Sequence, residues 1–181
     1  MSGDRKDSPE GSVVETARLR LRRFTRDDLD ALLEVFADPD ARRFYPEMIE
    51  PAAVAAWIER NLRRYEEHGF GLWAMIEKES GRLVGDAGLS YQDVEGVPEL
   101  DVGYHVLAAE RRKGYATEGA RACLDRGFRE TAATVIGSIV SPANAASRGV
   151  AGRIHANVRE FLRPNGVRLF YFTRRDEWER R

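Results

Sequence analysis

Apolar residues recur along the chain at two spacings, which predict alternating strands and helices. Residues 18–23 alternate between charged and apolar side chains, as expected of a half-buried strand. Residues 29–36 and 51–68 carry apolar side chains at every third or fourth position, and this spacing predicts two amphipathic helices. Pro51 suits the first position of the second helix and Gly69 suits its end.

The remainder of the chain predicts a mixed α/β domain. The predicted order continues with three strands (70–77, 83–91, 99–107), a helix (116–128), a strand (134–140), a helix (144–154) and a hairpin (158–162 with 167–173). The resulting order β-α-α-β-β-β-α-β-α-β-β is not an even βαβ repeat. We therefore expect an α/β (α+β) fold with a mixed sheet.

The length of 181 residues fits a single domain. Residues 1–12 are nearly free of apolar side chains and are predicted to be a disordered lead-in. Residues 13–175 are expected to form the domain. The sequence at 176–181 is highly charged and is predicted to be a solvated tail.

Composition narrows the classes of function. With 29 Lys and Arg against 30 Asp and Glu, the chain lacks the basic surplus that phosphate neutralisation on a nucleic acid requires. One cysteine and three scattered histidines give neither a disulfide framework nor a metal-ligand spacing. No apolar run is long enough to span a membrane. We expect a cytoplasmic protein with no metal, nucleic acid or membrane partner.

The segment at 111–117 has the character of an anion site. A predicted strand runs into Arg111-Arg-Lys-Gly114-Tyr-Ala116, where a helix begins. Amides at a helix N-terminus lack intrahelical partners and favour anions, while glycine permits a close approach of the backbone. Neither the P-loop nor the dinucleotide-binding glycine pattern is present. Each amide contact contributes only about 1 kcal/mol, so a ligand held here needs a second contact surface.

Four ordered blocks resemble one enzyme family. Arg111-x-x-Gly114-x-Ala116 is similar to the pyrophosphate loop of the GNAT superfamily of N-acetyltransferases, especially its ribosomal-protein N-terminal (RimJ/RimL-like) branch. The other blocks are Thr16-Ala-Arg-Leu-Arg-Leu-Arg22, Asp101-Val-Gly-Tyr-His-Val106 and Val140-Ser-Pro-Ala-Asn-Ala-Ala-Ser147. The resemblance spans roughly residues 15–173 in consistent order.

The resemblance implies a fold and a co-substrate. In this family a mostly antiparallel sheet has helices on both faces and two splayed central strands, here 99–107 and 134–140, and acetyl-CoA lies between them. Pantetheine is expected to pair with backbone at His105 and Val106, and Asn144 is expected to reach its far end. The pyrophosphate site implied by the loop consists of Arg111, Arg112, Lys113, Gly114, Tyr115, Ala116 and Thr117.

The reaction needs a base and a proton donor. At pH 7 most primary amines are protonated, so a base assists the attack on the thioester. Glu99 and Asp101 alternate onto one face of their strand and are the candidate general bases. The family's usual tyrosine donor aligns with Ala151 and is missing, so Ser147 is the substitute candidate.

The acceptor stays open at this stage. The leading hypothesis is an acetyl-CoA-dependent N-acetyltransferase acting by direct attack on a protein N-terminus or a small-molecule amine, as a monomer or homodimer. The alternative is a non-catalytic acyl-CoA-binding module, favoured by the missing tyrosine. His155, where many relatives have a glycine, could line the substrate mouth or only pack.

Overall fold

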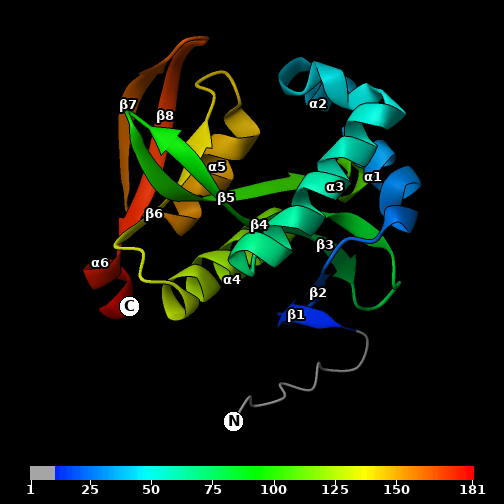
Figure 1. Cartoon of the computed structure of the whole chain (residues 1–181), viewed down its shortest axis with the longest axis horizontal. Coiled ribbons are helices and arrows are strands. Elements are labelled where there is room, and N and C mark those ends of the chain that lie inside the picture. Colours follow the sequence, from blue (N-terminus) through cyan, green and yellow to red (C-terminus); the bar gives the residue numbers. More distant parts are fainter. Residues whose placement is uncertain (1–10) are drawn as a thin grey trace.

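The computed structural model describes residues 11–181 (Figure 1). Within these residues eight strands form one sheet in the order β1-β2-β3-β4-β5-β6-β8-β7. All neighbouring strands are antiparallel except β5 and β6. The strands are β1 (Ser12–Glu15), β2 (Leu19–Arg22), β3 (Leu72–Glu77), β4 (Leu83–Val94), β5 (Val97–Val106), β6 (Val135–Val140), β7 (Asn157–Arg163) and β8 (Gly166–Arg174).

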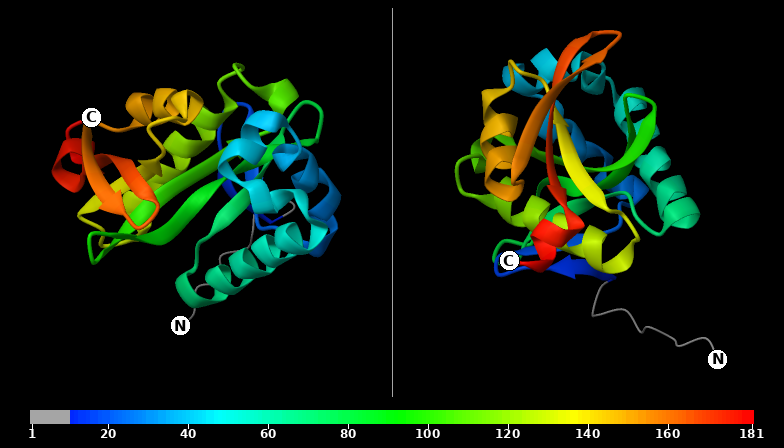
Figure 2. Two further views of the ribbon diagram at one scale, coloured as in Figure 1. Left: turned by 90° about the horizontal axis from the view of Figure 1, so that it is seen from above. Right: turned by 90° about the vertical axis from the view of Figure 1, so that its left-hand side faces the viewer.

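Helices cover both faces of the sheet (Figure 2). They are α1 (Leu29–Phe36), α2 (Pro39–Phe44), α3 (Pro51–His68), α4 (Tyr115–Glu130), α5 (Ala145–Ile154) and α6 (Arg175–Glu179), with short 3-10 turns at Arg26–Asp28, Pro46–Ile49 and Ala108–Glu110. Apolar side chains of α1 and α3 pack with β3 on one face. On the opposite face α4 packs against β2 to β5. The expected fold class, a mixed and mostly antiparallel sheet between helices, is confirmed.

The two central strands pair only briefly and then separate. The parallel contact of β5 with β6 consists of Leu100 with Ile136 and Asp101 with Gly137. Just beyond this pairing, the link between the strands is made by a side chain: the Ser138 hydroxyl donates to the carbonyl of Val102 at 2.8 Å. In the described chain the later part of β5 has no strand partner on this side. The sheet thus opens into two halves, β1–β5 and β6-β8-β7.

Three elements were not predicted from the sequence: β1, α2 and α6. Helix α2 begins at Asp38-Pro39, because the Asp38 carboxylate accepts from the amides of Asp40 and Ala41 while proline occupies the first turn.

The segment at 176–181, predicted to be a charged, solvated tail, is exposed at four of its six residues but is not wholly solvated. These residues overlap α6, where Trp178 stacks on Phe128 with ring centroids 5.3 Å apart. The indole Nε1 donates to Asp125 at 2.7 Å. Glu177 also accepts from Asn157 at 2.8 Å, so a stacked aromatic ring and a polar contact together hold this charged segment against the domain.

The predicted disordered segment at 1–12 lies mostly outside the described residues, and Ser12 already belongs to β1. None of the described helices is both long enough and apolar enough to cross a membrane.

Candidate functional site

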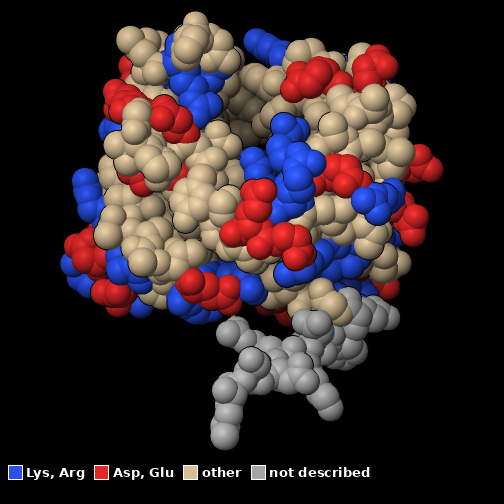
Figure 3. All heavy atoms as spheres, in the orientation of Figure 1, with Lys and Arg blue, Asp and Glu red and all other residues tan. Residues whose placement is uncertain are grey.

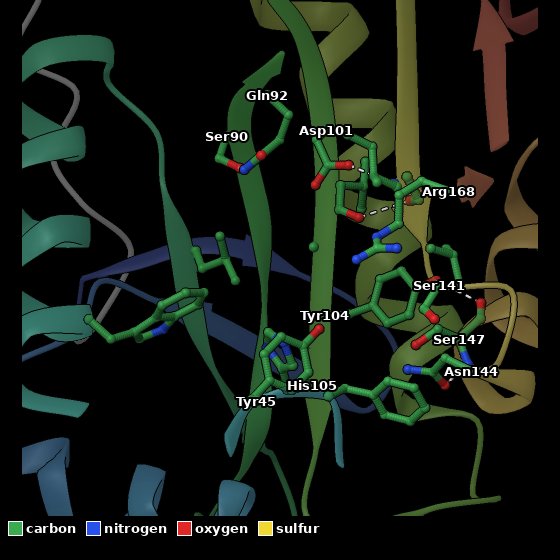
Figure 4. Close-up of a pocket in the computed structure, with 18 of the residues that line it drawn as sticks. Tyr45, Ser90, Gln92, Asp101, Tyr104, His105, Ser141, Asn144, Ser147 and Arg168 are labelled. Atoms are coloured by element: carbon green, nitrogen blue, oxygen red, sulfur yellow. Dashed lines mark hydrogen bonds between the residues drawn. The ribbon is translucent and has the colours of Figure 1, made fainter. Parts of the chain in front are cut away.

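A cavity of about 650 Å³ occupies the gap between the diverging strands (Figure 4). Its floor is formed by residues 101–105 of β5 and 138–140 of β6. The start of α5 closes one side. Side chains of α2, α3 and the β7–β8 hairpin form the remaining walls. Cavities of this size are typical of sites for small molecules and cofactors.

Asp101 lies where the strands part. Its Oδ1 accepts a hydrogen bond from the amide of Ile139 at 2.8 Å, so the carboxyl group spans the vertex of the gap. Burial raises the pKa of Asp101 to about 7, although the Ile139 amide and the charges of Arg163 and Arg64 act in the opposite direction. A carboxyl group with this pKa exchanges protons readily at neutral pH, as a general base must.

Glu99, the other predicted base, lies on the same strand face but is absent from the described lining of the cavity. Burial raises its pKa and the charge of Arg159 opposes the rise. The structure therefore brings only one of the two predicted carboxyl groups into the cavity.

The loop before α4 presents unpartnered main-chain amides. Within residues 11–181, no hydrogen-bond acceptor faces the amides of residues 112–117, whereas the next amide, that of Glu118, donates to the carbonyl of Gly114 at 3.0 Å. Arg112 and Gly114 both have left-handed backbone conformations, with φ of 61° and 89°. These conformations turn successive amides in one direction, as an anion site requires.

A distant part of the chain fixes this loop. Arg18 donates from Nε to Glu118 at 2.8 Å and from Nη1 to the carbonyl of Lys113 at 2.8 Å. Thr16 donates to the other Glu118 oxygen at 2.6 Å, and the Arg18 guanidinium lies over the Tyr115 ring. Residues of the Thr16–Arg22 block thus bind the start of α4 and support the loop before it.

The basic side chains of the loop are mostly engaged elsewhere. Arg111 donates to both oxygens of Asp38 at 3.0 and 2.7 Å, and thereby joins the loop to the first turn of α2. Lys113 pairs with Glu110 at 2.7 Å. The main-chain amides and the exposed Arg112 are therefore the groups of this loop left for an anion.

Three polar residues, Asn144, Ser147 and Tyr104, meet at the opposite wall of the cavity, beside the N-terminus of α5. The Oδ1 of Asn144 caps the helix by accepting from the amide of Ser147 at 3.0 Å. The hydroxyl of Tyr104, from β5, donates to the carbonyl of Ser147 at 2.9 Å. Burial, followed by the charge of Asp101, holds the pKa of the Tyr104 phenol well above its usual value, so this hydroxyl stays protonated.

Tyr104 is a candidate that the sequence analysis missed. Tyr104 alternates with Asp101 and His105 along β5, and nothing local indicates that a helix beginning about 40 residues later reaches its hydroxyl. The predicted donor position Ala151 is a fully buried alanine.

His105 has a side-chain environment that the sequence did not predict. Its Nδ1 lies 2.6 Å from Oδ1 of Asp86, a fully buried residue of β4. The imidazole also contacts the rings of Tyr45, Phe36 and Trp57, with centroids 4.8 to 5.8 Å apart. Of this group, His105, Tyr45 and Trp57 line the cavity on the α2–α3 side. Val106, predicted with His105 to pair with pantetheine, lies outside the described lining.

His155 is buried, not at a substrate mouth. Its two ring nitrogens lie 3.0 Å from the Ser138 hydroxyl and 3.2 Å from the Thr173 hydroxyl. Burial, together with the charge of Arg181, lowers its pKa to about 3, so it is neutral at physiological pH. His155 thus links β6 to β8.

Comparison with known proteins agrees with this geometry. The family model for the acetyltransferase (GNAT) domain matches residues 18–157. The uncharacterized protein YkkB of Bacillus subtilis is 32% identical over 149 residues, which cover 82% of this chain and 87% of that protein.

Solved structures share the fold. An acetyltransferase from Agrobacterium tumefaciens superposes with a TM-score of 0.74 at 25% identity, over 88% of this chain and 92% of that one. RimL, a ribosomal L7/L12 alpha-N-protein acetyltransferase solved in complex with coenzyme A, superposes with a TM-score of 0.71 at 14% identity, over 88% and 95% of the two chains. The chain therefore belongs to the GNAT family and is an acetyltransferase.

Proposed function

We propose that this protein transfers the acetyl group of acetyl-CoA to a primary amine by direct attack of the amine on the thioester. The observation that carries the proposal is the position of Asp101 at the vertex of the cavity, with a pKa of about 7. An amine beside this carboxyl group can lose its proton at the moment of attack, so no covalent acetyl-enzyme is needed.

The fit of acetyl-CoA rests on two features. The unpartnered amides of residues 112–117 match a diphosphate, because a helix N-terminus stabilises phosphate oxygens. The part of β5 after Val102 offers a strand edge against which a pantetheine arm can lie. Coenzyme A is also the ligand in the complex of RimL, which has this fold.

The proton balance assigns roles to residues of this chain. The amine nitrogen forms a bond to the acetyl carbon and releases a proton to the Asp101 carboxylate, directly or through one water. The carbon–sulfur bond then breaks and the sulfur leaves as a thiolate that needs a proton. Ser147 and Tyr104 both line the cavity at the α5 side and carry hydroxyl groups that can donate it. The donor hydroxyl then regains a proton from solvent while Asp101 releases one, so the site returns to its starting state. In this scheme Glu99 has no role, since it lies outside the described cavity lining.

Binding and turnover test the proposal separately. Isothermal titration should detect acetyl-CoA, and release of coenzyme A thiol should depend on an added amine. Initial-rate patterns should intersect, as expected of a ternary complex, and mass spectrometry should find no acetylated enzyme after incubation with acetyl-CoA alone. The absence of both heat and thermal stabilisation at millimolar acetyl-CoA would refute the proposal. Parallel initial-rate lines together with an acetylated protein would refute direct attack.

A further inference from the structure

The walls of the cavity are unusually rich in arginine. Five arginines from four separate elements line it: Arg43 of α2, Arg60 and Arg64 of α3, Arg163 of β7 and Arg168 of β8. Among the described lining residues Asp101 is the only acid. Figure 3 shows the face that carries the hollow, with Lys and Arg atoms at its margin. The molecule as a whole has a formal charge of −1, so this concentration of positive charge is local.

These five arginines form no ion pair with a carboxylate of the described residues, unlike several arginines elsewhere in the fold. Elsewhere Arg18 pairs with Glu118 at 2.7 Å and Arg22 with Asp28 at 2.8 Å. No ion pair involving a cavity arginine is formed within the described part of the chain. Their contacts there are with neutral groups: Arg43 with the Phe44 ring, Arg60 with the Trp57 ring, Arg64 with Asn61, Arg163 with Gln92 and the carbonyl of Asp93, and Arg168 with the carbonyl of Val167.

The like charges of the cluster repel one another. Burial lowers the pKa of Arg64, and the like charge of Arg60 lowers it further. Like charges around a cavity with low-dielectric walls reinforce one another and attract an anion. An anionic ligand would relieve the repulsion, because a guanidinium group binds carboxylate or phosphate through two parallel hydrogen bonds.

The diphosphate of coenzyme A, in the position proposed above, does not account for these arginines. The diphosphate is assigned to the amides of residues 112–117, and this loop contributes nothing to the described cavity lining. Asp101 lies on the same face of β5 as His105. The His105 ring packs against Tyr45, just after α2, and Trp57 of α3. Arg60 and Arg64 therefore line the side of the cavity from which an amine would approach Asp101.

We propose that the acceptor is a primary amine that also carries at least one carboxylate or phosphate group, held by the cavity arginines while its amine faces Asp101. This inference deepens the proposed function and rests on it. Two sources can supply such chemistry, a small amino acid or aminophosphate and the N-terminus of an acidic peptide. In both, the anionic group sets the orientation and the amine is acetylated.

Matched acceptor pairs test the charge requirement. The small-molecule arm compares O-phosphoethanolamine with ethanolamine and glutamate with its diamide. The peptide arm compares Ser-Asp-Glu-Asp with Ser-Asn-Gln-Asn. We expect kcat/KM to be at least about tenfold higher for the anionic member in at least one arm, since hydrogen bonds between charged groups are strong. Raising the salt concentration should reduce this preference.

Substitutions then assign the preference to the arginines. Arg60→Gln with Arg64→Gln should reduce the anionic preference about tenfold or more while the affinity for acetyl-CoA stays within twofold. Arg168→Gln, on the hairpin, provides an independent second variant. Arg63→Gln is the matched control, because Arg63 is an exposed residue of α3 outside the described cavity lining, and it should leave the preference unchanged.

The outcomes separate the two proposals. Equal transfer to charged and neutral partners, or a preference that survives in both arginine variants, would overturn the inference. Binding of acetyl-CoA without transfer to any anionic acceptor would also overturn it. A failure to bind acetyl-CoA at all would instead refute the proposed function.

Discussion

Replacing Asp101 with asparagine removes the ionisable group at the vertex of the cavity and keeps an oxygen for the Ile139 amide, which donates to Asp101 at 2.8 Å. The backbone around the gap should therefore retain its shape. A group that acts as general base contributes roughly 100- to 10,000-fold to the rate. We expect kcat/KM for the amine to fall by about 100-fold or more and the affinity for acetyl-CoA to change little.

The pH profile gives a second, sharper readout. With a pKa of about 7, Asp101 is about one-tenth ionised at pH 6 and about nine-tenths ionised at pH 8. Because the carboxylate is the active form, the rate should rise with pH through a limb near 7. A peptide α-amine gives a separate limb near its own pKa of about 8. The asparagine variant should lose the first limb and keep the second.

The free energy of unfolding should fall as pH rises, whereas the rate increases. The folded state binds a proton at Asp101 between its ordinary pKa of 3.8 and about 7, where the unfolded chain does not. Stability contributed by this group therefore falls as pH rises across that window. The pKa difference corresponds to at most about 4 kcal/mol, and because Asp101 lines the cavity we expect about 2 kcal/mol. Asp101→Asn should gain roughly 4–8 °C in Tm relative to the parent between pH 5 and pH 8.

Kinetics from pH 5.5 to 9 and thermal melts from pH 5 to 8 check both effects. Glu99→Gln serves as the comparison, since Glu99 lies outside the described cavity lining and should change kcat/KM by less than about threefold. An asparagine variant that keeps the limb near pH 7, or a larger loss at Glu99 than at Asp101, would refute the assignment of the base.

Three further substitutions test other parts of the site. Gly114→Val places a side chain at a φ of 89°, with its Cβ 3.2 Å from Arg18 Nη2, and titration should show a loss of acetyl-CoA affinity of roughly tenfold or more; an unchanged affinity would refute the loop assignment. Ser147→Ala should lower kcat roughly tenfold without changing the KM for acetyl-CoA, and an unaffected kcat would leave Tyr104 as the donor. His105→Phe should cost about 3 kcal/mol in urea unfolding, since it leaves the buried Asp86 unpaired, and Asp86→Asn in the same chain should recover part of the loss; additive effects would contradict a coupled pair.

Long periodic segments were predictable because local sequence decides them. The helix predicted at 51–68 is α3, which begins at Pro51 and ends at His68, with Gly69 as its C-terminal cap at a φ of 77°. The hairpin predicted from the Asn-Gly pair at 165–166 is β7–β8. In each case a proline, a glycine or a turn lies where the apolar spacing changes. The end of the helix or strand is therefore set without any distant residue.

Elements that depend on distant contacts were missed. Helix α2 has six residues and no buried side chain, so its sequence carries no apolar stripe. Its first turn is held by Arg111, 73 residues later in the chain. Helix α6 depends in the same way on a stack with Phe128. A short element stabilised from outside itself leaves no local signal.

In the site too, features set by local sequence were predictable and features set by distant contacts were not. Strand alternation placed Asp101 on one face with His105, and both line the cavity. The partner of His105 could not be inferred this way, since Asp86 becomes its neighbour only through the register of β4 and β5, in which residues 86 and 105 are paired. That register follows from the two-residue turn between Val94 and Val97, because residues equally far from the turn are paired.

The sequence blocks are best understood as parts that hold one another in position. Thr16 and Arg18 bind Glu118 and thereby support the loop whose amides face outward. Arg111 extends from that loop to Asp38, at the start of the helix that carries Arg43 into the cavity. The loop assigned to the diphosphate and the wall assigned to the acceptor thus share a direct salt bridge. Their relative position is therefore set by a contact within the protein, which is what transfer between two separately bound substrates requires.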